Sequence, residues 1–295
     1  MYHLFPFFTV LIWSGNAIVN KMSADIVEPS AMSFYRWLLA VLILSPFCLR
    51  YTLAKRKIIL PYIPKLLVLA LLGMVLNQSL GYYAAQTTSV SNMALITSLV
   101  PLISIFLSVP LLRKKVSFLS VVGAAISLFG LAFMLGQGDV LFIFQQAITE
   151  GDLLMVLAAI VYALYCVLVK KWKMPFGNLQ FIYLQGVLAV AMLAPLWLSS
   201  ENLTPVDEAL PLIAYAGFGA SVIAPWLWVK AIDVLGADTS AMFLNLLPVL
   251  AVALAAALLD ETIQLFHLIG GLFVISGVMM AQFKRKPAVT TPVVD

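Results

Sequence analysis

The chain has 295 residues, of which 63% are hydrophobic and only 10% are charged. A soluble globular protein carries about 25% charged residues, so the composition excludes an ordinary soluble enzyme and a disordered protein. A net charge of +4 does not indicate nucleic-acid binding, because the Lys and Arg residues lie in short clusters between apolar runs. The composition therefore indicates a polytopic membrane protein.

Ten apolar stretches follow one another along the chain, and each is about as long as the 20 residues that a helix needs to cross a bilayer. They cover residues 4–22, 30–49, 64–84, 92–112, 117–136, 152–171, 178–198, 209–230, 239–259 and 263–283. Strands of a membrane barrel would alternate over segments half as long. The sequence therefore predicts an all-α membrane protein with ten transmembrane helices.

The charges in the linkers predict how these helices are oriented. Basic residues occupy the even-numbered linkers and the tail: Arg50, Lys55, Arg56, Lys57, Lys65, Arg113, Lys114, Lys115, Lys170, Lys171, Lys173, Lys230, Lys284, Arg285 and Lys286. Acidic residues occupy the odd-numbered linkers: Asp25, Glu28, Asp139, Glu150, Glu201, Asp207, Glu208, Asp260 and Glu261. Cytoplasmic loops are the basic ones, so both termini are predicted to be cytoplasmic, in the cell (inner) membrane.

An internal repeat relates the two halves of the chain. Residues 84–133 align with 231–280 at a constant offset of 147, which pairs Pro101 with Pro248, and earlier positions align at an offset of 149. Each half contains five predicted spans, an odd number, so the halves are predicted to have opposite orientations in the membrane. Inverted repeats of this kind are common in secondary transporters. The chain has no G-x-x-x-x-G-K-[ST] motif, so ATP hydrolysis by this polypeptide is not expected.

The segment AIDVLGADTSAMFLNLLPVLAVALAAALLDETIQLFHLIGGLFVISGVMM resembles the closing pattern of the EamA domain. The matching residues are Leu235, Gly236, Ala237, Pro248, Glu261, Gly270 and Gly277. FYRWLLA, with Arg36, and LIWSGNAIVNK resemble the start of such a domain. The resemblance implies the drug/metabolite transporter superfamily, with EamA-like five-helix repeats at 1–136 and 150–284 and a cytoplasmic tail at 285–295. Lys114 departs from the family, which has Glu at that place in the first repeat.

Polar side chains deep in a span cost free energy unless they face a cavity or a partner. The candidate substrate-binding residues are therefore Asn16, Asn77, Gln78, Tyr82, Ser98, Tyr162, Tyr165, Gln185, Trp226, Asn245 and Arg36. Ser98 and Asn245 each precede a helix proline by three residues, and Pro101 and Pro248 are the predicted hinges. The alternative is that the two polar side chains satisfy carbonyls freed by the prolines, or bridge helices.

Arg36 is the one clear charge well inside a predicted span, and Gln185 is its repeat equivalent. It could anchor a substrate carboxylate, or it could be a structural arginine. The resemblance favours the structural role. No Asp or Glu lies in the middle of a span, and no cofactor or metal ligand set is present in the sequence.

These features predict a secondary transporter, an exporter or exchanger of a small neutral or zwitterionic metabolite such as an amino acid, working by alternating access. The alternatives are a membrane receptor or scaffold and an intramembrane enzyme, and the paired catalytic groups that the enzyme would need are missing from the spans. The expected partners are a small-molecule substrate and the lipid bilayer. A homodimer is left open, and nucleic acid is not expected.

Overall fold

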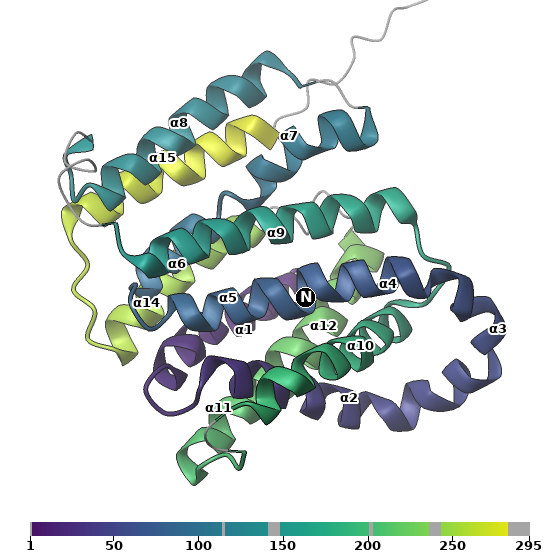
Figure 1. Cartoon of the computed structure of the whole chain (residues 1–295). Coiled ribbons are helices and arrows are strands. Elements are labelled where there is room, and N and C mark those ends of the chain that lie inside the picture. The colour runs from purple at the N-terminus through teal and green to yellow at the C-terminus, as the bar shows by residue number, and fades with distance from the viewer. Residues whose placement is uncertain (1, 114–115, 141–147, 201–202, 236–242, 283–295) are drawn as a thin grey trace, which may run out of the picture.

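The computed structural model describes residues 2–113, 116–140, 148–200, 203–235 and 243–282, and the regular secondary structure in them is helical (Figure 1). The first half contains α1 (Leu4–Ser23), α2 (Pro29–Ala54), α3 (Arg56–Ile59), η1 (Leu60–Tyr62), α4 (Ile63–Leu69), η2 (Ala70–Leu76), α5 (Asn77–Ala84), α6 (Val90–Thr97), α7 (Val100–Leu112) and α8 (Phe118–Leu135). The second half contains α9 (Glu150–Trp172), α10 (Asn178–Leu198), η4 (Asp207–Ala209), α11 (Leu210–Ala214), η5 (Tyr215–Ile223), α12 (Ala224–Leu235), η6 (Phe243–Leu246), α14 (Leu247–Leu258) and α15 (Leu265–Gln282).

Helix is present in each stretch that hydropathy predicts. Among the described residues, six helical segments are long and apolar enough to cross a membrane: Pro29–Ala54, Arg56–Ala84, Val90–Leu112, Glu150–Trp172, Asn178–Leu198 and Asp207–Ala231. Shorter apolar helices cover Phe118–Met134, Leu247–Leu258 and Leu265–Met280. The chain is therefore a multi-pass membrane protein. The third segment begins at Arg56 and not at residue 64, so it includes the charged residues Arg56 and Lys57 ahead of the predicted apolar stretch.

Two helices are interrupted at repeat-equivalent prolines. α6 ends at Thr97 and α7 begins at Val100, with Pro101 in its first turn. The 3₁₀ turn η6 leads into α14, which begins at Leu247 with Pro248 in its first turn. Proline lacks an N–H and is tolerated in the first turn of a helix, where that group has no intrahelical partner. The two α-helical starts are separated by the repeat offset of 147.

Two other helices contain π-helical segments, which are rare and often occur at functional sites. η2 covers Ala70–Leu76 and η5 covers Tyr215–Ile223. Adding the repeat offset of 147 to η2 gives residues 217–223, which lie inside η5. The irregularity therefore recurs at the same place in both halves of the chain.

The packing of the helices follows the repeat. α5 packs against α9, and its counterpart α12 packs against α1 (Figure 1). η2 packs against α10, and η5 packs against α2, while α2 and α10 contact each other directly. The two halves are thus intertwined, and each π-helical segment contacts a helix of the other half.

The α8–α15 pair runs antiparallel and is held by close glycine contacts. A Cβ atom added to Gly277 would lie 2.5 Å from the carbonyl oxygen of Gly123, and one added to Gly270 would lie 2.8 Å from that of Gly130. At the repeat offset of 147, Gly123 is equivalent to Gly270 and Gly130 is equivalent to Gly277. The Gly123–Gly277 contact is therefore the repeat equivalent of the Gly270–Gly130 contact. The Ser127 hydroxyl donates to the carbonyl oxygen of Val274 at 2.9 Å between them. Small residues of this kind allow membrane helices to approach closely.

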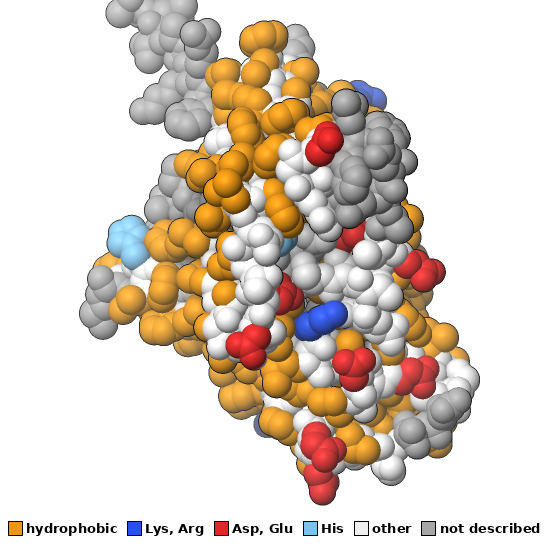
Figure 2. Space-filling model, turned by 90° about the vertical axis from the view of Figure 1, so that its left-hand side faces the viewer, with side chains coloured by type: hydrophobic (Ala, Val, Ile, Leu, Met, Phe, Trp, Pro, Cys, Tyr) orange, Lys and Arg blue, Asp and Glu red, His pale blue; other side chains and the backbone are white. Residues whose placement is uncertain are grey.

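One end of the molecule is acidic. The end of α8 and the start of α9 lie on the left in Figure 1, together with the end of α14 and the start of α15. Figure 2 shows that side, where acidic side chains are scattered over the surface and Lys and Arg are scarce. This is the end that the odd-numbered linkers form, and it is called the acidic end below.

Candidate functional site

Arg36 is the centre of a buried polar cluster, although it lies about 10 Å along α2 from its start. Its side chain is only 3% exposed. Nε donates to the hydroxyl of Ser221 at 2.8 Å, and Nη1 donates to Oε1 of Gln78 at 2.7 Å and to the hydroxyl of Tyr82 at 3.3 Å. The arginine therefore joins α2, α5 and the π-helical segment η5, which come from both halves of the chain.

The π-helical segments determine this geometry. The Ser221 hydroxyl donates to the carbonyl of Ala216, five residues earlier, and accepts from Arg36. Gly217 allows η5 to approach α2, because a Cβ atom there would lie 2.9 Å from the carbonyl oxygen of Arg36. In η2, the carbonyl of Met74 accepts a hydrogen bond from the indole of Trp37 at 3.0 Å. Both segments thus use irregular backbone to bind adjacent positions of α2.

Two amides extend the cluster from Arg36 towards α9. Gln78 Nε2 donates to Oδ1 of Asn77 at 3.3 Å, and Asn77 Nδ2 donates to the carbonyl of Ala158 at 3.2 Å. Both amides are half-buried. Three of the predicted residues, Asn77, Gln78 and Tyr82, lie on consecutive turns of α5. They therefore belong to the same polar cluster as Arg36 of α2.

A second polar pair lies on α1. Asn16 Nδ2 donates to Oδ1 of Asn20 at 3.2 Å, and Asn20 Nδ2 lies close to Gly81 on α5, within 3.4 Å of where a Cβ would be. Oδ1 of Asn16 is fully buried and accepts no hydrogen bond from the described residues. A buried acceptor of this kind costs free energy, so it is a candidate partner for a donor on a bound molecule.

The tyrosines of α9 form a separate aromatic wall. The rings of Tyr162 and Tyr165 are stacked, with centroids 5.5 Å apart and planes 20° apart. Tyr165 packs on Gly73 of η2, where a Cβ atom would lie 2.7 Å from the ring. Gln185 on α10 is fully buried beside Tyr165; its Nε2 donates to the carbonyl of Phe181, and its Oε1 has no partner among the described residues.

Other predicted residues lie outside these groups. The Ser98 hydroxyl donates to the carbonyl of Leu95 at 2.6 Å, near the end of α6, and not to the Thr97 carbonyl that Pro101 leaves without an N–H partner. Trp226 is 49% exposed on α12. The side chain of Asn245, before Pro248, lies outside the described residues, as does Lys114.

Two carboxylates from the second half hold the linker that joins α5 to α6, and they are called the acidic clamp. The first is Asp152, which is only 5% exposed. Its Oδ1 accepts from the Thr88 hydroxyl at 2.5 Å and from Asn92 Nδ2 at 3.2 Å. Its Oδ2 accepts from the hydroxyl and the backbone N–H of Thr149, in a capping box at the start of α9.

Glu261 is the second carboxylate of the acidic clamp. It accepts from the backbone N–H of Val90 at 2.8 Å and of Ser91 at 3.3 Å, and from the Ser91 hydroxyl at 2.8 Å. These N–H groups are unpaired within the first turn of α6, so the carboxylate acts as an N-terminal cap supplied by the other half. Lys21 complements it, because its Nζ donates to the carbonyls of Ala85 and Thr88 beyond the end of α5.

Comparison with known proteins decides the family. Residues 1–136 and 149–283 each match the EamA-like transporter family. The chain belongs to this family. An uncharacterized transporter of Archaeoglobus fulgidus is 27% identical over 290 residues, which cover 96% of this chain and 98% of that protein. The uncharacterized transporter YyaM of Bacillus subtilis is 24% identical over 265 residues, which cover 88% of this chain and 87% of that protein.

A solved crystal structure shares the fold of this EamA-like chain. Its TM-score is 0.66 at 18% sequence identity, and the match covers 95% of this chain and 96% of that chain. The EamA resemblance that the sequence predicts is thus confirmed over both halves. The fold comparison carries no information about substrate, because the identity is low.

Three residues that shape this EamA-like chain, Ser221, Asp152 and Glu261, are not among the candidate substrate-binding residues that the sequence predicts. Asp152 had a usable signal, since Thr149 and Asp152 have the spacing of a capping box. Glu261 was identified only as part of the family's acidic turn. Ser221 had no signal, because a single serine in an apolar helix looks the same whether it contacts another helix or a buried charge.

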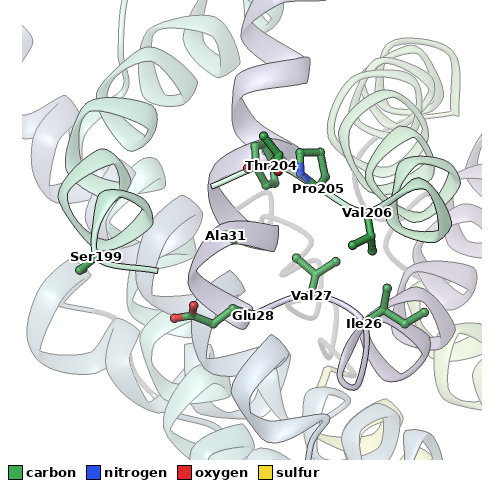
Figure 3. Close-up of a pocket in the computed structure, with 9 residues that line it drawn as sticks. Ile26, Val27, Glu28, Ala31, Ser199, Thr204, Pro205 and Val206 are labelled. Carbon is green, nitrogen blue, oxygen red and sulfur yellow. The ribbon is translucent and has the colours of Figure 1, made fainter. Parts of the chain in front are cut away.

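Two cavities of this EamA-like transporter lie at the acidic end, away from Arg36. One, of about 770 Å³, is lined by the acidic clamp and by Asn92 and His267. The other, of about 500 Å³, lies between two linkers; Figure 3 shows Val27 and Glu28 on one side and Pro205 and Val206 on the other. Neither cavity is lined by Arg36, Gln78, Tyr82 or Ser221, although Tyr35, the residue before Arg36, lines the smaller one.

Proposed function

We propose that this EamA-family protein is a secondary transporter that exports or exchanges a small neutral or zwitterionic metabolite, such as an amino acid. The observation that carries the proposal is the burial of Arg36 where both halves meet. Its side chain lies between η5 of the second half and α5 of the first half, and α5 directly follows the other π-helical segment, η2. A binding site at such a junction changes whenever the two halves move relative to each other. That is the requirement for alternating access.

The proposed architecture is ten transmembrane helices in two inverted five-helix repeats, 1–136 and 150–284. The antiparallel and reciprocal glycine contacts of α8 and α15 support it, because an axis that exchanges antiparallel helices is perpendicular to them. The paired prolines and paired π-helical segments support it as well. The acidic end would face outwards, which places both termini in the cytoplasm of a cell (inner) membrane.

The proposed binding site comprises the Arg36 cluster, the amides of α1 and α5, and the tyrosines of α9 with Gln185. Amides and aromatic rings select a small solute by hydrogen bonding and shape. Pro101 and Pro248 are proposed as hinges, since each starts the regular part of an interrupted helix. The acidic clamp would close the outer side, because it ties carboxylates of the second half to the α5–α6 linker of the first.

Uptake of labelled amino acids by proteoliposomes tests the proposal. The full chain should give saturable flux above protein-free liposomes, and Tyr162→Ala should reduce it at least about tenfold if the ring contributes one good contact of roughly 1.4 kcal/mol. Leu157→Ala is the matched control, since Leu157 lies on the same helix and is 47% exposed. Absence of saturable flux for every solute in a panel of amino acids, nucleosides and sugars would contradict the proposal.

A further inference from the structure

Arg36 is a buried cation that receives no counter-charge from the described part of the chain. Its hydrogen-bond partners Ser221, Gln78 and Tyr82 are all neutral, and it forms no ion pair with a described carboxylate. A buried charge is costly unless it is paired, and removal of a partner from a buried pair is strongly destabilising. The protein therefore carries a buried positive charge that something outside these residues must balance.

The hydrogen-bonding capacity of the cluster is only partly used. Nη2 of Arg36 makes no hydrogen bond to the described residues, so its N–H groups are available as donors. The Tyr82 hydroxyl accepts from Arg36 and donates to none of them, although its side chain is 1% exposed. Oδ1 of Asn16 is buried without a donor. Nη2 of Arg36 and the Tyr82 hydroxyl are thus available as hydrogen-bond donors to a bound molecule, and the Asn16 acceptor belongs to the separate pair on α1.

A purely structural arginine would be arranged differently. Such residues commonly satisfy backbone carbonyls at helix ends, as Lys21 does with Ala85 and Thr88. Arg36 donates only to side chains, and each of them comes from a helix with irregular backbone within it or just before it. Of the three partners, Ser221 is itself held by the backbone, because its hydroxyl donates to the carbonyl of Ala216.

We propose that the transported molecule is a small metabolite with a single carboxylate, such as an amino acid, and that this carboxylate accepts hydrogen bonds from Nη2 of Arg36 and from the Tyr82 hydroxyl. A guanidinium matches the planar geometry of a carboxylate. The cluster has one positive charge, so a phosphate dianion would leave a net negative charge buried, whereas a monocarboxylate balances it. This inference rests on the proposed transport function and narrows its substrate class.

A variant that supplies the counter-charge tests the inference without knowledge of the substrate. Gln78→Glu keeps the shape of the side chain and places a carboxylate 2.7 Å from Nη1. The melting temperature of the full chain in detergent should rise by roughly 3 °C. A moderate stabilisation produces a shift of about this size in a chain of this length. In an Arg36→Gln background the same change should lower it. Ser221→Asp, which faces Nε at 2.8 Å, is the second variant.

A fall in melting temperature for both Gln78→Glu and Ser221→Asp would overturn the inference, because it would show that Arg36 is already neutralised. The ligand arm uses alanine, leucine and phenylalanine, each as the acid and as its amide. At least one acid should stabilise the protein and its amide should not, and the effect should disappear in Gln78→Glu and in Arg36→Gln. Equal stabilisation by acids and amides, or none by any acid, would overturn the substrate class. An acid that binds but is not transported by proteoliposomes would contradict the transport function alone.

Discussion

Removal of the Glu261 carboxylate should weaken the contact between the two halves at the acidic end. The carboxylate accepts three hydrogen bonds from the first turn of α6, two of them from backbone N–H groups. Glu261→Ala removes all three and leaves those N–H groups without a protein partner. Glu261→Gln keeps the shape but removes the negative charge that the positive end of the helix favours.

The size of the effect follows from these bonds. Loss of a helix N-cap costs about 1 kcal/mol, and a carboxylate at a helix N-terminus contributes roughly 0.3–1 kcal/mol more. We expect Glu261→Ala to destabilise the protein by about 2 kcal/mol, which corresponds to a fall of roughly 4 °C in melting temperature. Glu261→Gln should have about half that effect, because the amide oxygen still accepts hydrogen bonds.

The measurement is thermal unfolding in detergent, followed by intrinsic tryptophan fluorescence. Asp260→Asn is the matched control, because Asp260 is the adjacent acid and is exposed. The reactivity of a cysteine introduced at Ser91 towards an impermeant thiol reagent should increase in Glu261→Ala if the linker opens. A melting temperature equal to that of the unchanged protein would refute the role of Glu261 as a cap, as would equal effects of Glu261→Ala and Asp260→Asn.

Two glycine positions give further predictions. Gly277→Leu should destabilise the protein by about 2 kcal/mol, which is a usual cost of overpacking, because even a Cβ atom there would lie 2.5 Å from the Gly123 carbonyl oxygen. A melting temperature unchanged from that of the parent would contradict the close α8–α15 contact. Gly73→Ala should displace the Tyr165 ring, which lies 2.7 Å from the added atom, and should reduce flux in proteoliposomes more than it reduces melting temperature. Gly177→Ala serves as the control for both, since nothing lies within 4 Å of its added atom; flux equal to that of this control would refute the placement of Tyr165.

The positions of the helices follow from hydropathy because the bilayer requires long apolar helices. α2, α9 and α10 lie within a few residues of the predicted stretches. The breaks before Pro101 and Pro248 are also legible in the sequence, since a proline cannot donate to a helix hydrogen bond. The π-helical segments could not be predicted from the sequence. Ala70–Leu76 and Tyr215–Ile223 contain mostly apolar residues, with no local pattern that favours the wider π-helical turn over the α-helical one.

Pattern alone could not decide which face of each helix is buried. In water, a polar face marks the outside of a helix, but lipid tails are as apolar as the protein core, so lipid-facing and buried side chains look alike. Trp226 illustrates this: it is 49% exposed on α12, and an aromatic residue in so apolar a segment is compatible with a buried or a lipid-facing position. Ser221 illustrates the opposite case, since an unremarked serine proves to be a partner of Arg36.

By itself, the sequence determined that the protein resides in a membrane, where its helices lie, that its halves are related, and that one arginine and several amides are buried. The tertiary structure decided which of these polar groups meet. Arg36, Gln78, Tyr82 and Ser221 come together because helices from both halves cross there, and Glu261 caps a helix of the other half because the two halves are intertwined. Contacts between residues far apart in the chain depend on how helices pack, and in a bilayer packing is decided by shape and a few polar contacts, not by hydropathy.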